Sequence, residues 1–137
     1  MHGDAWHGPS VMELLDGVSW QQAAARPIAS AHSIWELVLH IAAWSNIARR
    51  RTLGEAVSPT DAEDWPPVGD TNEETWSKAK AEMVKSQAKL AELISTLKEE
   101  QLEATTPGKD YSNYFLLHGI VQHNLYHGGQ IALLKKM

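Results

Sequence analysis

Apolar residues recur at helical spacing along much of this chain. Between residues 34 and 48 they fall at intervals of three and four, which places them in one stripe on a helix: Ile34, Leu37, Val38, Ile41, Trp44 and Ala48. Ser33 precedes the stripe as a helix cap, and Gly54 follows it as a stop signal. The pattern therefore predicts a helix that begins at Ser33 and ends before Gly54.

Three other segments are also predicted to be helical. Residues 71–97 combine an apolar face with intervening Lys and Glu, and Thr71 with Glu74 has the form of a capping box. Residues 113–136 form the last predicted helix, with two lysines near the negative end of its dipole. A shorter helix is predicted from Ser10 to Asp16, with Pro9 in its first turn and Gly17 after its end.

The remaining stretches connect these helices. Residues 55–70 combine proline, glycine and acidic side chains, which indicates a crossover loop over the surface. No stretch alternates in the manner of a β-strand. With 137 residues, 43% of them hydrophobic, the sequence predicts one all-α domain over residues 1–137.

Composition and charge exclude several classes of function. The net charge is −5, so no basic surface is available for phosphates, and we expect no nucleic-acid partner. The absence of cysteine rules out disulfides, thiolate ligands and a cysteine nucleophile. The sequence shows neither a signal-peptide pattern nor an apolar run of ~18 residues, so we expect a cytoplasmic protein with no membrane partner.

Three histidines occupy apolar helix faces. His123 and His127 are four residues apart, in register with Leu116, Ile120, Ile131 and Leu134, so both imidazoles lie in the apolar stripe of the last predicted helix. His40 lies between Leu37 and Trp44 in the stripe of the earlier helix. A buried neutral imidazole needs partners for both nitrogens. Spacing alone leaves two interpretations open, a metal site and hydrogen-bonded core histidines.

Other reaction centres fit the sequence less well. Glu36 and His40 are four residues apart, whereas di-iron carboxylate bundles use Glu-x-x-His motifs together with inward glutamates. The chain has no HExxH motif, no CxxCH motif and no phosphate-binding glycine loop. No serine lies in a nucleophile-elbow context.

At these residues the sequence resembles the DinB-like family of four-helix-bundle metalloenzymes, also called the YfiT-like or DinB/bacillithiol-transferase superfamily. The resemblance is carried by AHSIWELVLHIAAW at residues 31–44 and LHGIVQHNLYHGGQI at residues 117–131. It runs from Trp6 to the C-terminus and includes WHGPS at residues 6–10 and EDWPP at residues 63–67. It implies a four-helix bundle of the up-down-down-up type, here with a shortened first helix.

The resemblance also implies a site and a chemistry. In the family, one histidine of the second helix and an HxxxH pair of the fourth bind a divalent metal, which by position implies His40, His123 and His127 as ligands. Zinc is our first expectation, with nickel, iron or manganese as alternatives. Family enzymes transfer small thiols such as bacillithiol, mycothiol or glutathione. A non-catalytic metal-binding module for binding or stress response and a hydrolase that uses metal-bound water are the alternatives.

The resemblance departs from the family at the start of the chain. Related sequences have further helical turns before the Trp-His-Gly segment, so we expect apolar stripes left exposed or covered by a second copy in a homodimer.

Roles for the residues around the predicted site are less defined, and no catalytic residue is assigned. Gln130 is either a donor to the pocket or a surface glutamine. His7 is expected to cap a turn, and His32 and His118 to lie off the metal face. Gly128 and Gly129 either admit a close neighbour or interrupt the helix. Core positions are expected for four tryptophans: Trp6, Trp35, Trp44 and Trp76. Of these, Trp44 is the best candidate for a substrate contact.

Overall fold

A computed structural model describes residues 8–137, so the expectations for Trp6 and His7 lie outside the described residues. The secondary structure within this range is helical, and residues 8–137 contain no β-strand. The helices are α1 (Val11–Leu15), α2 (Trp20–Ala24), α3 (Ile34–Thr52), α4 (Asp61–Asp64), α5 (Glu73–Thr96), α6 (Glu99–Glu103) and α7 (Asn113–Leu134).

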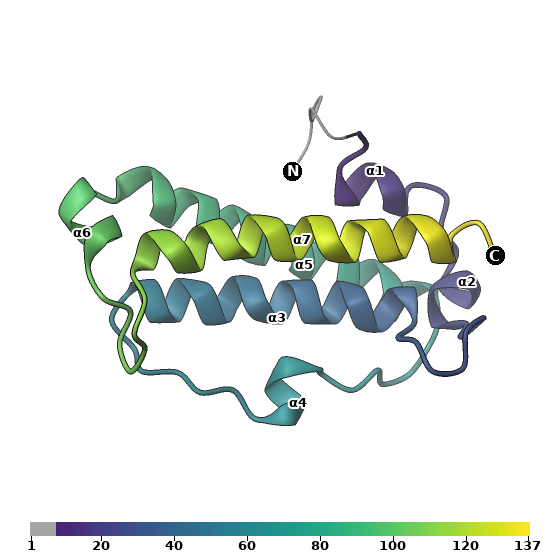
Figure 1. Ribbon diagram of the computed structural model, residues 1–137. Helices are drawn as coiled ribbons and strands as arrows, with labels where there is room; N and C mark the ends of the chain where they lie inside the picture. The colour runs from purple at the N-terminus through teal and green to yellow at the C-terminus, as the bar shows by residue number, and fades with distance from the viewer. Residues whose placement is uncertain (1–7) are drawn as a thin grey trace.

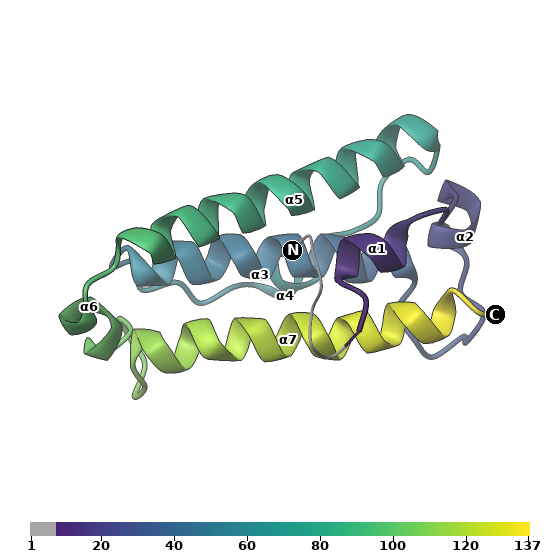
Figure 2. The same ribbon diagram turned by 90° about the horizontal axis from the view of Figure 1, so that it is seen from above.

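The three long helices lie side by side, with α3 in contact with both α5 and α7 (Figures 1 and 2). α3 and α5 run in one direction, and α7 and the short α1 run in the other (Figure 2). This arrangement is the up-down-down-up order that the family resemblance implies. α1 has only 5 residues and packs against α7.

α3 begins and ends where the sequence predicts. The Ser33 side chain accepts a hydrogen bond from the backbone N–H of Glu36, and the Glu36 carboxylate accepts one from the N–H of Ser33. At the other end, Gly54 has a φ of 101°, a left-handed conformation that ends the helix at little cost for glycine. At the centre of the apolar stripe of α3, Leu37, Val38 and Ile41 are buried.

α5 supplies the largest buried side chain of the core. The Trp76 ring has no exposed surface, packs against Trp35, and donates from Nε1 to the carbonyl oxygen of Val18 at 3.0 Å. The predicted cap at Thr71 is wrong by one residue. Asn72 caps the helix instead, in a reciprocal box with Thr75, because its side chain reaches the N–H three residues on.

Three short helices are absent from the predicted pattern. α2, α4 and α6 have four or five residues each, which is too few for an apolar stripe to repeat. α6 includes Glu99, Glu100 and Glu103, which are solvent-exposed and form a separate turn after α5. At α1 the cap is Ser10, so Pro9 lies just before the helix and not in its first turn.

α7 exposes apolar side chains along its outer face. Asn113 to Leu134 contain no charged residue, and apolar positions occur on all sides of this helix. Those with at least two fifths of their surface exposed are Tyr114, Phe115, Val121, Leu125, Tyr126 and Leu133. The expectation that the apolar stripes of α3 and α7 are exposed or covered by a second copy is wrong for the stripes themselves. α3 is covered by its two neighbours, and the stripe of α7, which includes Ile120 and Ile131, is buried within the bundle. Among the described helices, none has the length and apolar character needed to cross a membrane.

Candidate metal centre

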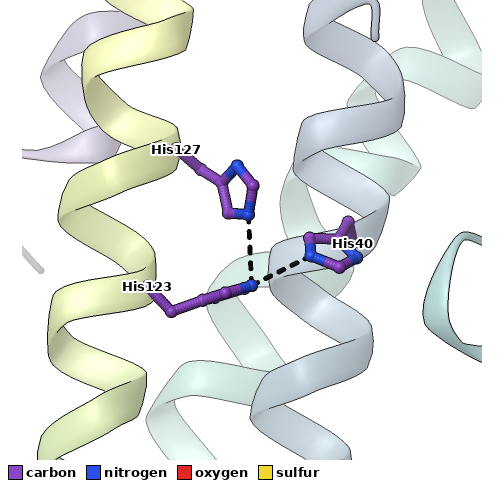
Figure 3. A group of neighbouring side chains, drawn as sticks. All are labelled: His40, His123 and His127. Carbon is purple, nitrogen blue, oxygen red and sulfur yellow. Dashed lines mark hydrogen bonds between the residues drawn. The ribbon is translucent and has the colours of Figure 1, made fainter.

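Three imidazoles converge between α3 and α7 (Figure 3). Nε2 of His123 lies 2.9 Å from Nε2 of His40 and 3.1 Å from Nε2 of His127. The candidate ligand nitrogens of all three residues lie within 4.8 Å of one another. His40 and His127 are buried and His123 is partly buried. The structure therefore brings together the three histidines that the sequence and the family resemblance indicate.

The backbone of each helix explains this convergence. His123 and His127 are one turn apart on α7, so their side chains leave the same face of the helix. His40 projects from the face of α3 that packs against α7. Ile131 of α7 belongs to the same buried apolar cluster as Ile41 of α3, and Ile120 of α7 belongs to a second cluster with Ala48 of α3. This apolar packing holds the two helices together.

The opposite nitrogens of two rings are held by oxygen acceptors. Nδ1 of His40 lies 2.6 Å from the carbonyl oxygen of Asp64, and Nδ1 of His127 lies 2.6 Å from Oε1 of Gln130. A carbonyl or amide oxygen only accepts hydrogen bonds, so both Nδ1 atoms carry the proton and donate it. The Nε2 atoms of His40 and His127 therefore present lone pairs to the centre of the cluster.

This distribution of protons suits a cation. The lone pairs on Nε2 of His40 and His127 both face Nε2 of His123. A single proton on that nitrogen can bond to only one of them at a time. Nδ1 of His123 is buried and makes no hydrogen bond within the described residues. Three nitrogen donors within reach of one point match the ligand type of divalent transition metals. The residues present fit a bound divalent ion.

Burial also keeps the three rings neutral. Desolvation is the main cause that lowers the pKa of His123 to about 4, and the neighbouring rings of His127 and His40 contribute to the same shift. Desolvation likewise lowers the pKa of His40 and of His127, against the opposing effect of their hydrogen bonds to Asp64 and Gln130. Neutral imidazoles are the form that binds metals, because a protonated ring has no free lone pair.

Aromatic rings border the cluster on the side of the crossover segment. The ring of Trp65 stacks on His40 with a centroid distance of 3.8 Å, and the ring of His32 stacks on Trp65 at 3.6 Å. Trp44 lies edge-on to His40 and donates from Nε1 to the Asp64 carboxylate at 2.6 Å. Trp44 and Trp65 are partly buried and form an aromatic wall beside the histidines on this side.

The residues with undefined roles now have positions. Gln130 is an acceptor for His127, not a donor to the pocket. His118 is exposed and stacks on Tyr114, off the site as predicted. His32 is not among the clustered ligands but contacts the wall through Trp65. The glycine pair leaves α7 uninterrupted, and Gly128 lies against Val11 and Leu14 of α1, the close neighbour expected there.

Asp64 and Trp65 were not identified as site residues from the sequence. They lie 24 and 25 positions after His40, in a segment without periodicity, so spacing could not relate them to the histidines. The only available signal was the family-like segment EDWPP at residues 63–67, which places an acid and an indole in a loop rich in proline.

The lowered pKa of His123 predicts a pH-dependent stability of the metal-free protein. Its folded-state pKa, about 4, lies below the ordinary 6.5, so between these values the unfolded chain binds more protons. Its contribution is thus complete above pH 6.5 and is lost as the pH falls toward 4. We expect chelator-treated protein to lose unfolding free energy over this range in urea titrations.

Two substitutions isolate this contribution. His123→Leu has no titratable ring, so its stability should fall less steeply with acidification than that of the wild type. His118→Leu removes an exposed imidazole of the same helix and should keep the wild-type pH dependence. Equal slopes for wild type and His123→Leu would contradict the assignment of the pH effect to His123.

Comparison with known proteins identifies the family of the chain. A family model described as the DinB superfamily matches residues 6–131. No curated protein and no solved structure shows significant similarity to the chain. Because the family match spans most of the sequence, the chain belongs to the DinB superfamily.

Proposed function

We propose that this chain is a metal-dependent enzyme in which His40, His123 and His127 bind one divalent ion. The observation that carries the proposal is the convergence of their three Nε2 atoms, with the Nδ1 atoms of two rings already occupied by acceptors. Core histidines without a metal would leave lone pairs facing one another in a buried site. The alternative of ordinary hydrogen-bonded core histidines accounts less well for this arrangement.

The donor set favours a catalytic site over a structural one. Structural zinc sites have four protein ligands, whereas three neutral imidazoles leave a coordination position free and the charge of the ion uncompensated. Nitrogen ligands favour zinc, nickel or iron over calcium or magnesium, and zinc is our first choice. When bound, such an ion supplies positive charge that stabilises a thiol substrate as its thiolate near neutral pH.

We propose transfer of a small thiol to an electrophile as the reaction. The chain contains no cysteine, so the sulfur atom must belong to a substrate. Gln130 and Asp64 orient two of the rings, and Trp44 and Trp65 lie along one side of the cluster. These residues bind and orient, while the group that moves the proton of the thiol is unassigned.

Loss of one ligand is expected to abolish metal retention. His123→Ala removes the nitrogen that lies between the other two, so the purified variant should retain far less than one equivalent of zinc by elemental analysis. His118→Ala is the matched control, because it removes an exposed imidazole from the same helix. A metal content in His123→Ala equal to that of the control would refute the ligand assignment.

Thiol binding at the metal is expected to be visible in the cobalt-substituted protein. Addition of glutathione or cysteine should produce a sulfur-to-cobalt charge-transfer band in the near-ultraviolet spectrum, and the S-methylated forms of the same compounds should not. If the loaded protein shows no band with any common low-molecular-weight thiol, a non-catalytic metal-binding module becomes the better description.

We also propose that the exposed face of α7 is a homodimer interface. Helices that are apolar on all sides are normally buried, and this face carries no charge along the whole helix. Gly129 lies on the same face with nothing within 4 Å of an added Cβ, so a neighbouring helix could approach closely. A two-fold interface pairs one patch with itself, so an uncharged face needs no partner of complementary charge.

The dimer is expected to depend on α7. Leu125→Lys places a charge in the proposed interface and should shift the protein from dimer to monomer in sedimentation velocity. Ile94→Lys on α5 is the matched control, since both side chains have 41% of their surface exposed, and it should remain dimeric. A monomeric wild-type protein at micromolar concentration would contradict the proposal.

A further inference from the structure

The crossover segment between α3 and α5 makes several contacts with the proposed metal ligand His40. This segment runs along the bundle beside α3 and carries α4 midway (Figure 1). Asp64, the last residue of α4, places its carbonyl oxygen 2.6 Å and its carboxylate Oδ1 3.3 Å from Nδ1 of His40. The same carboxylate oxygen accepts the hydrogen bond from Trp44 at 2.6 Å. One loop residue is thus joined to two side chains one turn apart on α3.

The local sequence explains why Asp64 occupies this position. Thr60 caps α4 in a reciprocal box with Glu63. This box fixes the start of a single helical turn, so the backbone carbonyl groups at the end of α4 point away from Thr60. The final carbonyl groups of any helix lack donors within the helix. At Asp64 the ring Nδ1–H of His40 supplies that donor, so the end of α4 and the histidine satisfy each other.

The next residue fixes the plane of the histidine ring. Trp65 and His40 are stacked at 3.8 Å with an angle of 7° between their planes, and Trp65 and His32 are stacked at 3.6 Å with the same angle. Two rings cannot both lie so close over one face of an indole, so Trp65 lies between the two histidines. Rotation of the His40 ring about its χ angles would break both the stack and the bond to Asp64.

We propose that Asp64 is a positioning residue for the metal ligand His40, and that the end of α4 holds the ring of this ligand in its metal-binding orientation before the metal binds. The inference rests on the proposed function. The backbone carbonyl of Asp64 accepts the proton of His40 Nδ1, so the lone pair of Nε2 is directed at His123 and His127. Its carboxylate also lies near enough to Nδ1 to raise the basicity of the ring, as carboxylates behind metal-bound histidines do.

A simpler role for Asp64 would be to attach the loop to α3 through Trp44. The two roles predict different effects of substitution. If Asp64 only attaches the loop, its removal should lower the unfolding free energy of the metal-free protein and leave metal affinity almost unchanged once the protein is folded. If Asp64 positions His40, metal affinity should fall even where the metal-free protein remains folded.

The test compares Asp64→Ala and Asp64→Asn with the wild type and with Asp61→Ala, an exposed acid on the same short helix. Zinc affinity is measured by competition with a chromophoric chelator. Asp64→Ala keeps the backbone carbonyl but removes the carboxylate that lies 3.3 Å from Nδ1 of His40. We expect it to bind zinc about 10- to 100-fold more weakly, the range found when such supporting groups are removed. Asp64→Asn keeps an oxygen acceptor but loses the charge, so its affinity should be intermediate. Asp61→Ala should stay within about two-fold of the wild type.

A second measurement does not depend on the metal. The ¹⁵N shifts of the imidazole nitrogens in the chelator-treated wild type should show His40 protonated on Nδ1. Protonation of His40 on Nε2, or an unchanged zinc affinity in Asp64→Ala, would overturn the positioning role while leaving a metal-binding wild type intact. Failure of the wild type itself to bind zinc, nickel, iron or manganese would overturn both this inference and the proposed function.

Discussion

The packing of α3 against α7 is the constraint on which the candidate metal centre depends. Two of the three imidazoles share α7, so their separation is set by one helical turn. The third comes from α3, and only the register of the two helices brings its Nε2 to within 2.9 Å of His123. A slip of one turn, about 5.4 Å, would take His40 out of reach. The buried apolar residues on both helices therefore maintain the geometry of the polar cluster.

Much of the fold could be predicted from the sequence because the long helices repeat their apolar pattern over several turns. The same spacing placed His40, His123 and His127 on faces directed to the core, and the structure brings these three together. The resemblance to the DinB-like family, which the family match confirms, supplied the helix order and the idea of a metal. Spacing alone left core histidines as an equal interpretation.

The contacts around the histidines could not be predicted in the same way. Asp64 and Trp65 reach His40 across a non-periodic loop, and their roles depend on where α4 ends in space. Gln130 was considered from its place on α7, but whether it donates or accepts depends on the tautomer of His127. At the start of α5, Thr71 and Asn72 are both suitable capping residues, so the sequence could not decide between them, and the structure shows that Asn72 is the cap.

The parallel course of α3 and α5 has a topological consequence. Two parallel neighbours cannot be joined by a tight turn, so the connection must return along the full length of the bundle (Figure 1). In a bundle of strictly alternating helices, every short connecting loop would lie at an end of the bundle, far from its middle. Here the return path passes the midpoint of α3 and brings backbone carbonyl groups and an indole there. The chain thereby obtains a flank for its polar centre from its connectivity, and Trp65 and Val68 of the same segment also pack against the apolar core that the helices share.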